Sequence, residues 1–218
     1  MRNNTARRHS HENLFHCRAT LAVWAALIVP LFAIIAAPPA AAQGVVADGM
    51  AVTVTGPITI TTPPGSMPGA GVPALFAING GSITSSGPIT LVPGIFGLGA
   101  DAGAGSSITI GPSAGSTITT QGGGTDGLRA LGAGSRINAT DFTVMTSGGF
   151  SDGVLAQGGG VILLQNGRVT TAGSNANGLV ANVGGQITAT NVDVVTTGPT
   201  AVALAATNNG QLTITVKL

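Results

Sequence analysis

The chain has 218 residues and a formal net charge of +1, with 44% hydrophobic, 7% charged and 3% aromatic residues. Ordinary globular domains have about 25% charged residues, so this composition, with 35 glycines and abundant Thr, Val, Ile and Ala, favours short strands and tight turns over helices. Regularly spaced aliphatic residues exclude a disordered glycine-rich tract, and the four scattered basic residues that stand against six aspartates from Gln43 onward exclude a nucleic-acid surface.

The first 42 residues have the three parts of a secretory signal peptide. Positions 1–18 are basic and polar, a nearly continuous apolar run follows, and Ala40-Ala41-Ala42 supplies the small residues that a signal peptidase reads. We therefore expect a helical leader over 1–42, cleavage before Gln43, and a mature chain without a membrane span. A retained anchor is the alternative, since the apolar run is just long enough to cross a bilayer, but Pro30 interrupts it.

The mature chain contains no His, Cys, Glu, Tyr or Trp, because those that occur in the sequence all lie before Gln43. This excludes disulfides and thiolate nucleophiles, and it removes most general bases and transition-metal ligands. Only Asp, Ser, Thr, Lys and Arg remain for any chemistry, and we expect no cofactor.

A unit of about 25 residues repeats along the chain and is clearest at Gly178–Thr188. Its last glycine recurs at nearly constant spacing, at Gly134, Gly160, Gly185 and Gly210. Self-similarity at such a period is typical of solenoids. Repeats are therefore expected over 72–218, after an irregular initial coil or cap over 43–71. A surplus of residues within Gly111–Gly124 predicts an inserted loop.

Aliphatic residues that recur at fixed places in the unit predict the inward face, because residues i and i+2 of a strand share a face. One strand carries a large and a small column: Leu75, Leu128, Val154, Leu179 and Leu204, then Ala77, Ala130, Ala156, Ala181 and Ala206. Two further columns are Ile162, Ile187 and Leu212, and Val144, Val169 and Val194. Three strands in each coil, as the inward-facing columns indicate, predict an all-β fold, namely a right-handed parallel β-helix of about 25 residues per coil.

Two polar or small sets recur at the corners between strands. The set between the second and third strands is Asp141, Asn166 and Asn191. Asx side chains tolerate unusual dihedral angles, and stacked copies can bond one another along the axis. The set that closes each coil is Gly148, Gly173 and Gly198. Glycine at a repeated corner predicts a positive φ.

The segments Asp126–Ala130, Asp152–Ala156 and Asn177–Ala181, each followed by a small-residue turn, Ile-Thr-type strands and a Thr-Thr-Gly-like close, resemble the passenger repeats of bacterial autotransporters. The resemblance covers 74–216 and the leader. It implies an exported protein at the cell surface or outer membrane of a Gram-negative bacterium, or outside the cell, with an adhesive or structural stalk role and no catalysis. The family also carries a C-terminal membrane β-barrel, whereas this sequence stops at Leu218. We expect an N-terminal passenger fragment without the barrel, or a short solenoid secreted alone.

Asp126 and Asp152 are the candidate chemical site, because they occupy equivalent positions on neighbouring coils about 5 Å apart. Such a pair suits Ca²⁺, or the carboxylate chemistry of a β-helix polysaccharide lyase or hydrolase. The alternative is that both residues only form the turn, since Asn177 takes the same place without a charge. Arg129 and Arg136 lie nearby and are expected to offset the two carboxylates.

Three outward patterns concern partners. Arg168 and Asp193 are equivalent on neighbouring coils and are expected to pair. Thr-X-Thr pairs such as Thr188 and Thr190 suggest the hydroxyl face of an ice-binding solenoid, a minor alternative because they do not recur on every coil. The β-prone run Gln211–Val216 has no net charge, and an uncovered strand edge is a template for another strand. The expected partner is an unknown surface ligand or a second copy of the chain bound through this C-terminal rung.

Overall fold

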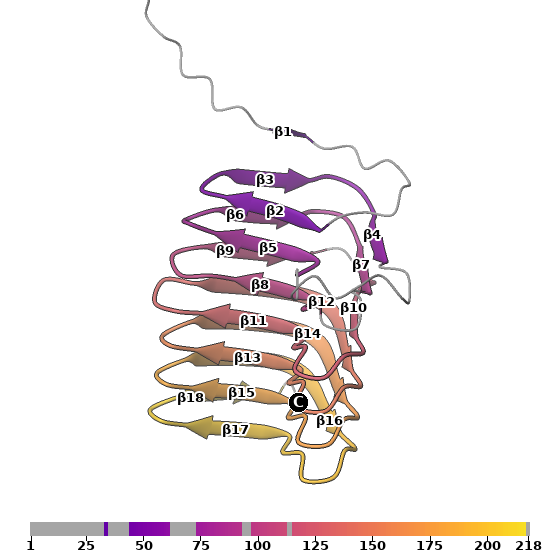
Figure 1. The fold of residues 1–218 in the computed structure, drawn as a ribbon, viewed down its shortest axis with the longest axis vertical. Coiled ribbons are helices and arrows are strands. Elements are labelled where there is room, and N and C mark those ends of the chain that lie inside the picture. The colour runs from indigo at the N-terminus through magenta and orange to yellow at the C-terminus, as the bar shows by residue number, and fades with distance from the viewer. Residues whose placement is uncertain (1–32, 35–43, 62–72, 93–96, 113–114, 217–218) are drawn as a thin grey trace, which may run out of the picture. The chain divides into compact units, whose positions relative to one another are not determined.

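The computed structural model describes residues 33–34, 44–61, 73–92, 97–112 and 115–216. Every described residue belongs to one compact unit, Phe32–Leu218. The regular elements of this described part are strands paired in parallel, without any helix. The all-β class and the parallel solenoid of stacked coils are therefore confirmed (Figure 1).

Each coil contributes its first strand to a seven-stranded parallel sheet. The strands follow one another in the sheet in chain order, so each coil stacks on the coil before it (Figure 1). They are β2 (Val45–Asp48), β5 (Leu75–Ile78), β8 (Ala100–Ala102), β11 (Leu128–Leu131), β13 (Val154–Gln157), β15 (Leu179–Asn182) and β17 (Leu204–Thr207).

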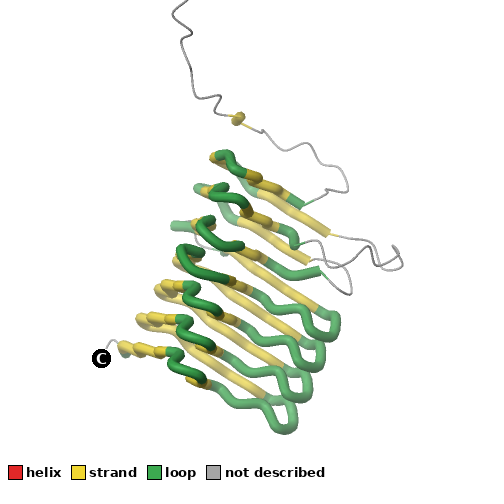
Figure 2. Tube along the Cα trace, turned by 60° about the vertical axis from the view of Figure 1, so that its left-hand side comes forward, coloured by secondary structure: helices red, strands yellow, loops and turns green. Residues whose placement is uncertain are grey.

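The second and third strands of the coils, together with β1 (Ala33–Ile34), make up the other sheet, of eleven strands (Figure 2). The separate second strands are β3 (Ala51–Val54), β6 (Ser82–Ser85), β9 (Ser107–Ile110) and β18 (Gln211–Thr215), and the separate third strands are β4 (Ile58–Thr61), β7 (Ile89–Val92) and β10 (Ser116–Thr120). In three coils the two strands join into one bent strand of 11 residues: β12 (Arg136–Thr146), β14 (Val161–Thr171) and β16 (Gln186–Thr196). The three expected strand positions per coil are present, and a bend replaces a loop between two of them.

The expected leader lies outside the described residues except at two positions. Ala33–Ile34 form the short strand β1, which pairs in parallel with β3. The expected irregular initial coil contributes the regular strands β2, β3 and β4, which pair in register with β5, β6 and β7. Residues 62–72, which complete that segment, lie outside the described part of the chain.

The predicted inward columns form the core. Leu128, Val154 and Leu179 lie in register and are fully buried, as is the alanine column two positions further on from Ala130 to Ala181. In the two other columns Ile162, Ile187, Val144 and Val169 are buried in the same way, whereas Val194 and Leu212 are partly buried and pack against the core. In β17, the outermost described strand of its sheet, the equivalent residue is exposed. Every second side chain of each strand thus points inward, and these side chains form a narrow aliphatic core that continues from coil to coil.

Buried threonines close the corner that leads from the third strand to the next coil. The Thr120 hydroxyl donates to the carbonyl of Thr125, the Thr146 hydroxyl to that of Ser151, and the Thr171 hydroxyl to that of Ala176, at 2.7, 2.9 and 2.7 Å. Each bond spans five residues and repeats on the next coil. A side chain that points into the core therefore satisfies a backbone carbonyl that the turn would otherwise leave unpaired.

Corner length differs between coils although the strands stay in register. Ile110 pairs with Ala139, and Ser116 pairs with Phe142. The segment from Ile110 to Ser116 is therefore three residues longer than the equivalent segment from Ala139 to Phe142 on the next coil. This places the predicted insertion between β9 and β10.

The pairing of Arg136 with Val161 puts Ser135 opposite Gly160. The expected equivalence of Gly134 and Gly160 is therefore wrong by one residue, because the turn after β11 is one residue longer than the turn after β13. Gly185 and Gly210 keep the predicted register with Gly160.

Candidate functional site

Asp126, Asp152 and Asn177 form a ladder at the corner just before β11, β13 and β15. The Asp152 N–H donates to Asp126 Oδ1 at 2.9 Å, and the Asn177 N–H donates to Asp152 Oδ1 at 2.9 Å. Asn177 Nδ2 also donates to Asp152 Oδ1, at 3.0 Å, and Asn177 Oδ1 in turn accepts the N–H of Val202 at 2.9 Å. Each side-chain oxygen therefore holds the backbone of the next coil, and the uncharged Asn177 does so as well as the two aspartates.

Burial changes the protonation of this ladder. It is the main cause that raises the pKa of Asp126 from 3.8 to about 7, and the negative charge of Asp152 raises the pKa further, while the hydrogen bond from the Asp152 N–H and the charge of Arg129 oppose the rise. Burial also raises the pKa of Asp152, against the bonds from Asn177. Asp126 can therefore hold a proton near neutral pH, which is the property that a general acid needs.

Arg129 pairs with a partner that the sequence pattern did not indicate. Its Nε and Nη2 donate to the two carboxylate oxygens of Asp101 at 3.1 and 2.7 Å, a bidentate pair across β8 and β11. The hydrogen bond to Asp101 is the main cause that raises the pKa of Arg129. The expected offset holds in part: the charge of Arg129 lowers the pKa of Asp126 without a direct contact. Arg136 Nε instead donates to Asn138 Oδ1 on its own strand.

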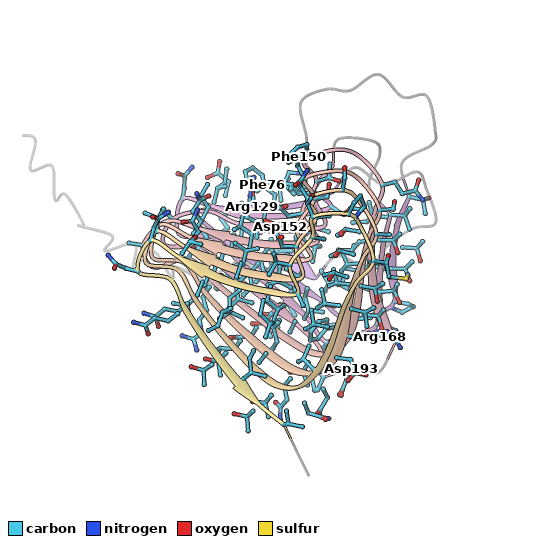
Figure 3. All side chains as sticks on the ribbon, turned by 90° about the horizontal axis from the view of Figure 1, so that it is seen from below. Phe76, Arg129, Phe150, Asp152, Arg168 and Asp193 are labelled. Carbon is cyan, nitrogen blue, oxygen red and sulfur yellow. The ribbon has the colours of Figure 1, made fainter. Side chains whose placement is uncertain are left out.

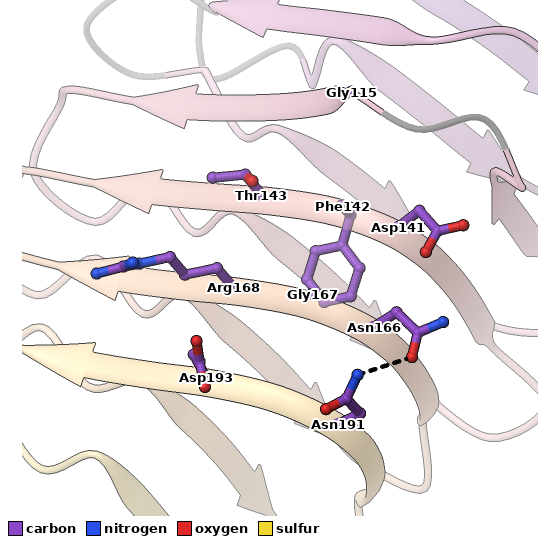
Figure 4. A pocket seen from close by; sticks show the side chains of 9 residues that line it. All are labelled: Gly115, Asp141, Phe142, Thr143, Asn166, Gly167, Arg168, Asn191 and Asp193. Carbon is purple, nitrogen blue, oxygen red and sulfur yellow. Dashed lines mark hydrogen bonds between the residues drawn. The ribbon is translucent and has the colours of Figure 1, made fainter. Parts of the chain in front are cut away.

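The bend between the second and third strands has the predicted chemistry. Asp141, Asn166 and Asn191 all have positive φ, at 54°, 51° and 55°. The Asn191 Nδ2 donates to Asn166 Oδ1 at 3.0 Å, so the amides bond along the stacking direction (Figure 4). Asx residues adopt this left-handed conformation more readily than other side chains do.

The glycines that close each coil have a different role from the predicted one. Gly148, Gly173 and Gly198 do not have positive φ. A Cβ at Gly148, Gly173 or Gly198 would instead collide with the backbone carbonyl of the preceding coil. Positive φ occurs two residues later, at Phe150, Asn175 and Thr200. Glycine is thus required by close stacking of the coils and not by the dihedral angle.

A shallow groove of about 420 Å³ lies on the outer surface at the bend of β12, β14 and β16 (Figure 4). Its lining residues are Gly115, Asp141, Phe142, Thr143, Asn166, Gly167, Arg168, Asn191 and Asp193. Arg168 and Asp193 pair in register, as expected, but the ion pair within the described residues joins Arg129 and Asp101 instead. Seen along the stack, Arg168 and Asp193 lie at a different corner from Arg129 and Asp152 (Figure 3).

The sequence pattern did not single out this groove as a site. The bend residues and the pair of Arg168 and Asp193 were each visible as repeats, but nothing in the linear spacing indicated that they line one hollow. The sequence does contain a signal for the groove: the bend residues and the Arg168–Asp193 pair recur with the same spacing, and Arg168 comes two positions after the bend residue Asn166.

The described ranges carry neither of two signatures, a metal-binding cluster or a membrane-spanning helix. Within them, no group of three or more His, Cys, Asp or Glu side chains is placed to hold a metal ion. The same ranges contain no helix with the length and apolarity needed to cross a membrane.

The chain matches no protein-family model, no curated protein and no solved structure. The resemblance to autotransporter passengers therefore stays a prediction from the repeats. The parallel solenoid itself rests on the strand pairing described above.

Proposed function

We propose that the chain is an exported, passenger-like β-solenoid of a Gram-negative cell surface, or released from it, with an adhesive or structural stalk role. The carrying observation is the continuous parallel register from β2 to β18, which stacks coil on coil around one narrow core. Serial stacking of this kind presents an extended outer surface for contacts and needs no catalytic centre. The leader over 1–42 supports export, and the absence of cysteine from the mature chain suits a protein stabilised by repetition.

The second candidate is a polysaccharide lyase or hydrolase that uses Asp126 and Asp152. The pKa of about 7 favours it, because a buried carboxyl that keeps its proton can act as a general acid. The ladder favours the structural role, because both carboxylates accept backbone N–H groups of the next coil and Asn177 makes the same bond without a charge.

Two measurements separate these candidates. Beads coated with the purified chain are expected to retain bacterial or host cells, or matrix, more strongly than beads coated with an inert protein. The same preparation is expected to leave pectin-like and other uronate polymers intact. Turnover of such a polymer that is lost in Asp126→Asn or Asp152→Asn would establish the enzyme instead.

A second copy of the chain is a further candidate partner. Val202, Leu204 and Ile214 are exposed large hydrophobic residues on the outermost described coil, which supports contact with another such surface. Sedimentation of the 218-residue chain at several concentrations tests this: a concentration-independent monomer contradicts self-association.

A further inference from the structure

The described part of the chain contains nine charged side chains, and six of them have structural hydrogen bonds. Those six are Asp48, which accepts from Asn79; Asp101 and Arg129, which pair; Asp126 and Asp152, which accept backbone N–H groups; and Arg136, which donates to Asn138. The remaining three are Asp141, Arg168 and Asp193, and all three line the groove at the bend.

These three charges are available to a ligand. Within the described residues Asp141 and Asp193 have no side-chain hydrogen bond, and Arg168 has a single long one, from its Nε to Thr170 Oγ1 at 3.4 Å. The chain has only 7% charged residues, and those of the described ranges that lack a short side-chain hydrogen bond gather in one hollow. None of the three holds a neighbouring coil through its side chain, although the left-handed bend favours an Asx residue at Asp141.

The groove presents its polar groups as two rows across three coils (Figure 4). One row lies at the bend and consists of Asp141, Asn166 and Asn191; the other lies two positions on and consists of Thr143, Arg168 and Asp193. The preceding coil has Gly115 at the bend position, so no side chain closes that end.

The chemistry of the rows selects the class of ligand. Carboxylates accept hydrogen bonds, a guanidinium only donates, and amides do both. A hydroxyl also donates and accepts, so a polyhydroxylated ligand can satisfy every group in the groove. The two carboxylates and one guanidinium give the lining a net negative charge, which disfavours polyanions such as uronate polymers or nucleic acid.

Two other ligand classes fit the geometry poorly. A single metal ion would have to reach Asp141 and Asp193 together, but these residues lie two coils apart, about 10 Å, whereas Ca²⁺ binds oxygen at about 2.3–2.6 Å. An apolar small molecule needs an enclosed, largely apolar pocket, whereas this groove is shallow and most of its lining side chains are polar.

We propose that the groove binds a neutral oligosaccharide whose chain runs along the stacking direction, with successive sugar hydroxyls meeting successive coils. The proposal names the ligand class for the adhesive role and in that sense rests on the proposed function. The groove supplies charge-assisted hydrogen bonds from Arg168 and to Asp141 and Asp193, which are stronger than neutral ones.

Isothermal titration calorimetry with the full chain tests the proposal. The probes are three neutral hexasaccharides (cellohexaose, maltohexaose and mannohexaose), hexagalacturonate as the charged counterpart, and a lysine-rich peptide. At least one neutral hexasaccharide is expected to bind with a Kd on the order of 1 mM or tighter. The variant with both Arg168→Thr and Asp193→Thr is expected to bind it at least about tenfold more weakly.

The chain itself supplies the replacements and the control. Thr143 occupies the equivalent position one coil before Arg168 and two coils before Asp193, so threonine fits this strand position. Arg136→Gln removes one positive charge from the same strand as Thr143, outside the groove, and places there the residue that Gln186 supplies two coils on. This control is expected to bind like the parent, and melting temperatures confirm that each variant is folded.

Three results would overturn the inference: no neutral hexasaccharide binds, the double variant binds as tightly as the control, or the uronate or the peptide binds more tightly than every neutral sugar. The proposed function fails separately. If the parent chain bound the sugar but retained neither cells nor matrix, adhesion would be contradicted. If the double variant retained them as well as the parent does, only the role of the groove in retention would be contradicted.

Discussion

At the residue scale, the corners require left-handed backbone at fixed positions, and one residue that occupies such a position, Val183, is unsuited to it. In four coils the turn after the first strand has positive φ at two adjacent residues, and these pairs are Asn79-Gly80, Gly158-Gly159, Val183-Gly184 and Asn208-Asn209. Asparagine and glycine suit such a turn. Val183 at φ 48° does not, because a β-branched side chain crowds its own backbone in the left-handed region.

Val183→Asn is therefore expected to increase the free energy of unfolding by about 1 kcal/mol, since it relieves left-handed strain. Val183 is 51% exposed, so little packing is lost. Urea unfolding measures the change. Val202→Asn is the control, because it removes a similarly exposed valine whose φ is not positive. Equal effects of the two substitutions would mean that polarity, and not relief of strain, is responsible.

Asp126 gives stability a specific pH dependence. Its pKa is 3.8 when unfolded and about 7 when folded, so the folded state binds the extra proton between these values. The contribution of protonated Asp126 to the free energy of unfolding is fully present below about pH 4 and is lost as the pH rises to about 7. Because the residue is only 6% exposed, the loss could reach about 4 kcal/mol.

Asp126→Asn is expected to stabilise the chain at pH 8 but not at pH 4, because it removes the buried charge and keeps the oxygen that accepts the Asp152 N–H. Asn177 already fills this role one coil beyond Asp152. Urea unfolding of parent and variant at both pH values measures the difference. Asp193→Asn, at an exposed position, is the control for the removal of one carboxylate from the surface. A parent chain that gains stability from pH 4 to pH 8 relative to the variant would contradict the assigned burial cost.

At the element scale, the strands were predictable and the corners were not. Columns such as Leu128 to Leu179 follow from alternation within a strand and equal steps between coils, and both survive in the structure. The Asp101–Arg129 pair spans 28 residues and escaped detection because the insertion before β10 lengthens that coil. Corners absorb extra residues without disturbing strand register, so spacing alone cannot align coils of unequal length.

A column of outward threonines illustrates the same limit. Thr59, Thr90, Thr117 and Thr143 lie in register on four successive third strands. The steps between them along the sequence are unequal, so no fixed period reveals them. The groove at the bend was missed for a related reason: the sequence displays its two rows, but only the left-handed bend brings them around one hollow.

Gly173→Ala tests the role of close stacking at the corner. The added Cβ would meet the Gly148 carbonyl of the preceding coil, and this is backbone that cannot rotate away. We expect a loss of about 1–3 kcal/mol, as for overpacking. Gly123→Ala is the control, because its Cβ would make an ordinary contact at 3.5 Å and Ser174 occupies that place two coils on. Thermal unfolding that shows equal losses for both variants would refute the stacking explanation.

At the scale of the whole molecule, each coil is stabilised by the coils that pair with it. The core is a set of columns, in which buried side chains such as Val154 lie in register with their equivalents on the coils before and after. Stability in such a structure is a sum of coil and interface contributions, so the effect of a defect depends on how many interfaces it breaks. A residue in an inner coil contributes to two interfaces and one in the outermost described coil to one.

Leu179→Asp and Leu204→Asp turn this dependence into a measurement at one structural position. Leu179 is fully buried in β15, so the new carboxylate would be left without a partner inside the core at a cost of several kcal/mol. Leu204, its equivalent in β17, is 43% exposed, so the same charge remains partly hydrated there.

We expect Leu179→Asp to lower the melting temperature strongly and to remove part of the far-UV circular dichroism of the strands, because the coils on both sides lose an interface. Leu204→Asp should alter both observables only slightly. If the two variants melted at the same temperature, stability would not be transmitted coil by coil, and the chain would unfold as one unit whatever the position of the defect.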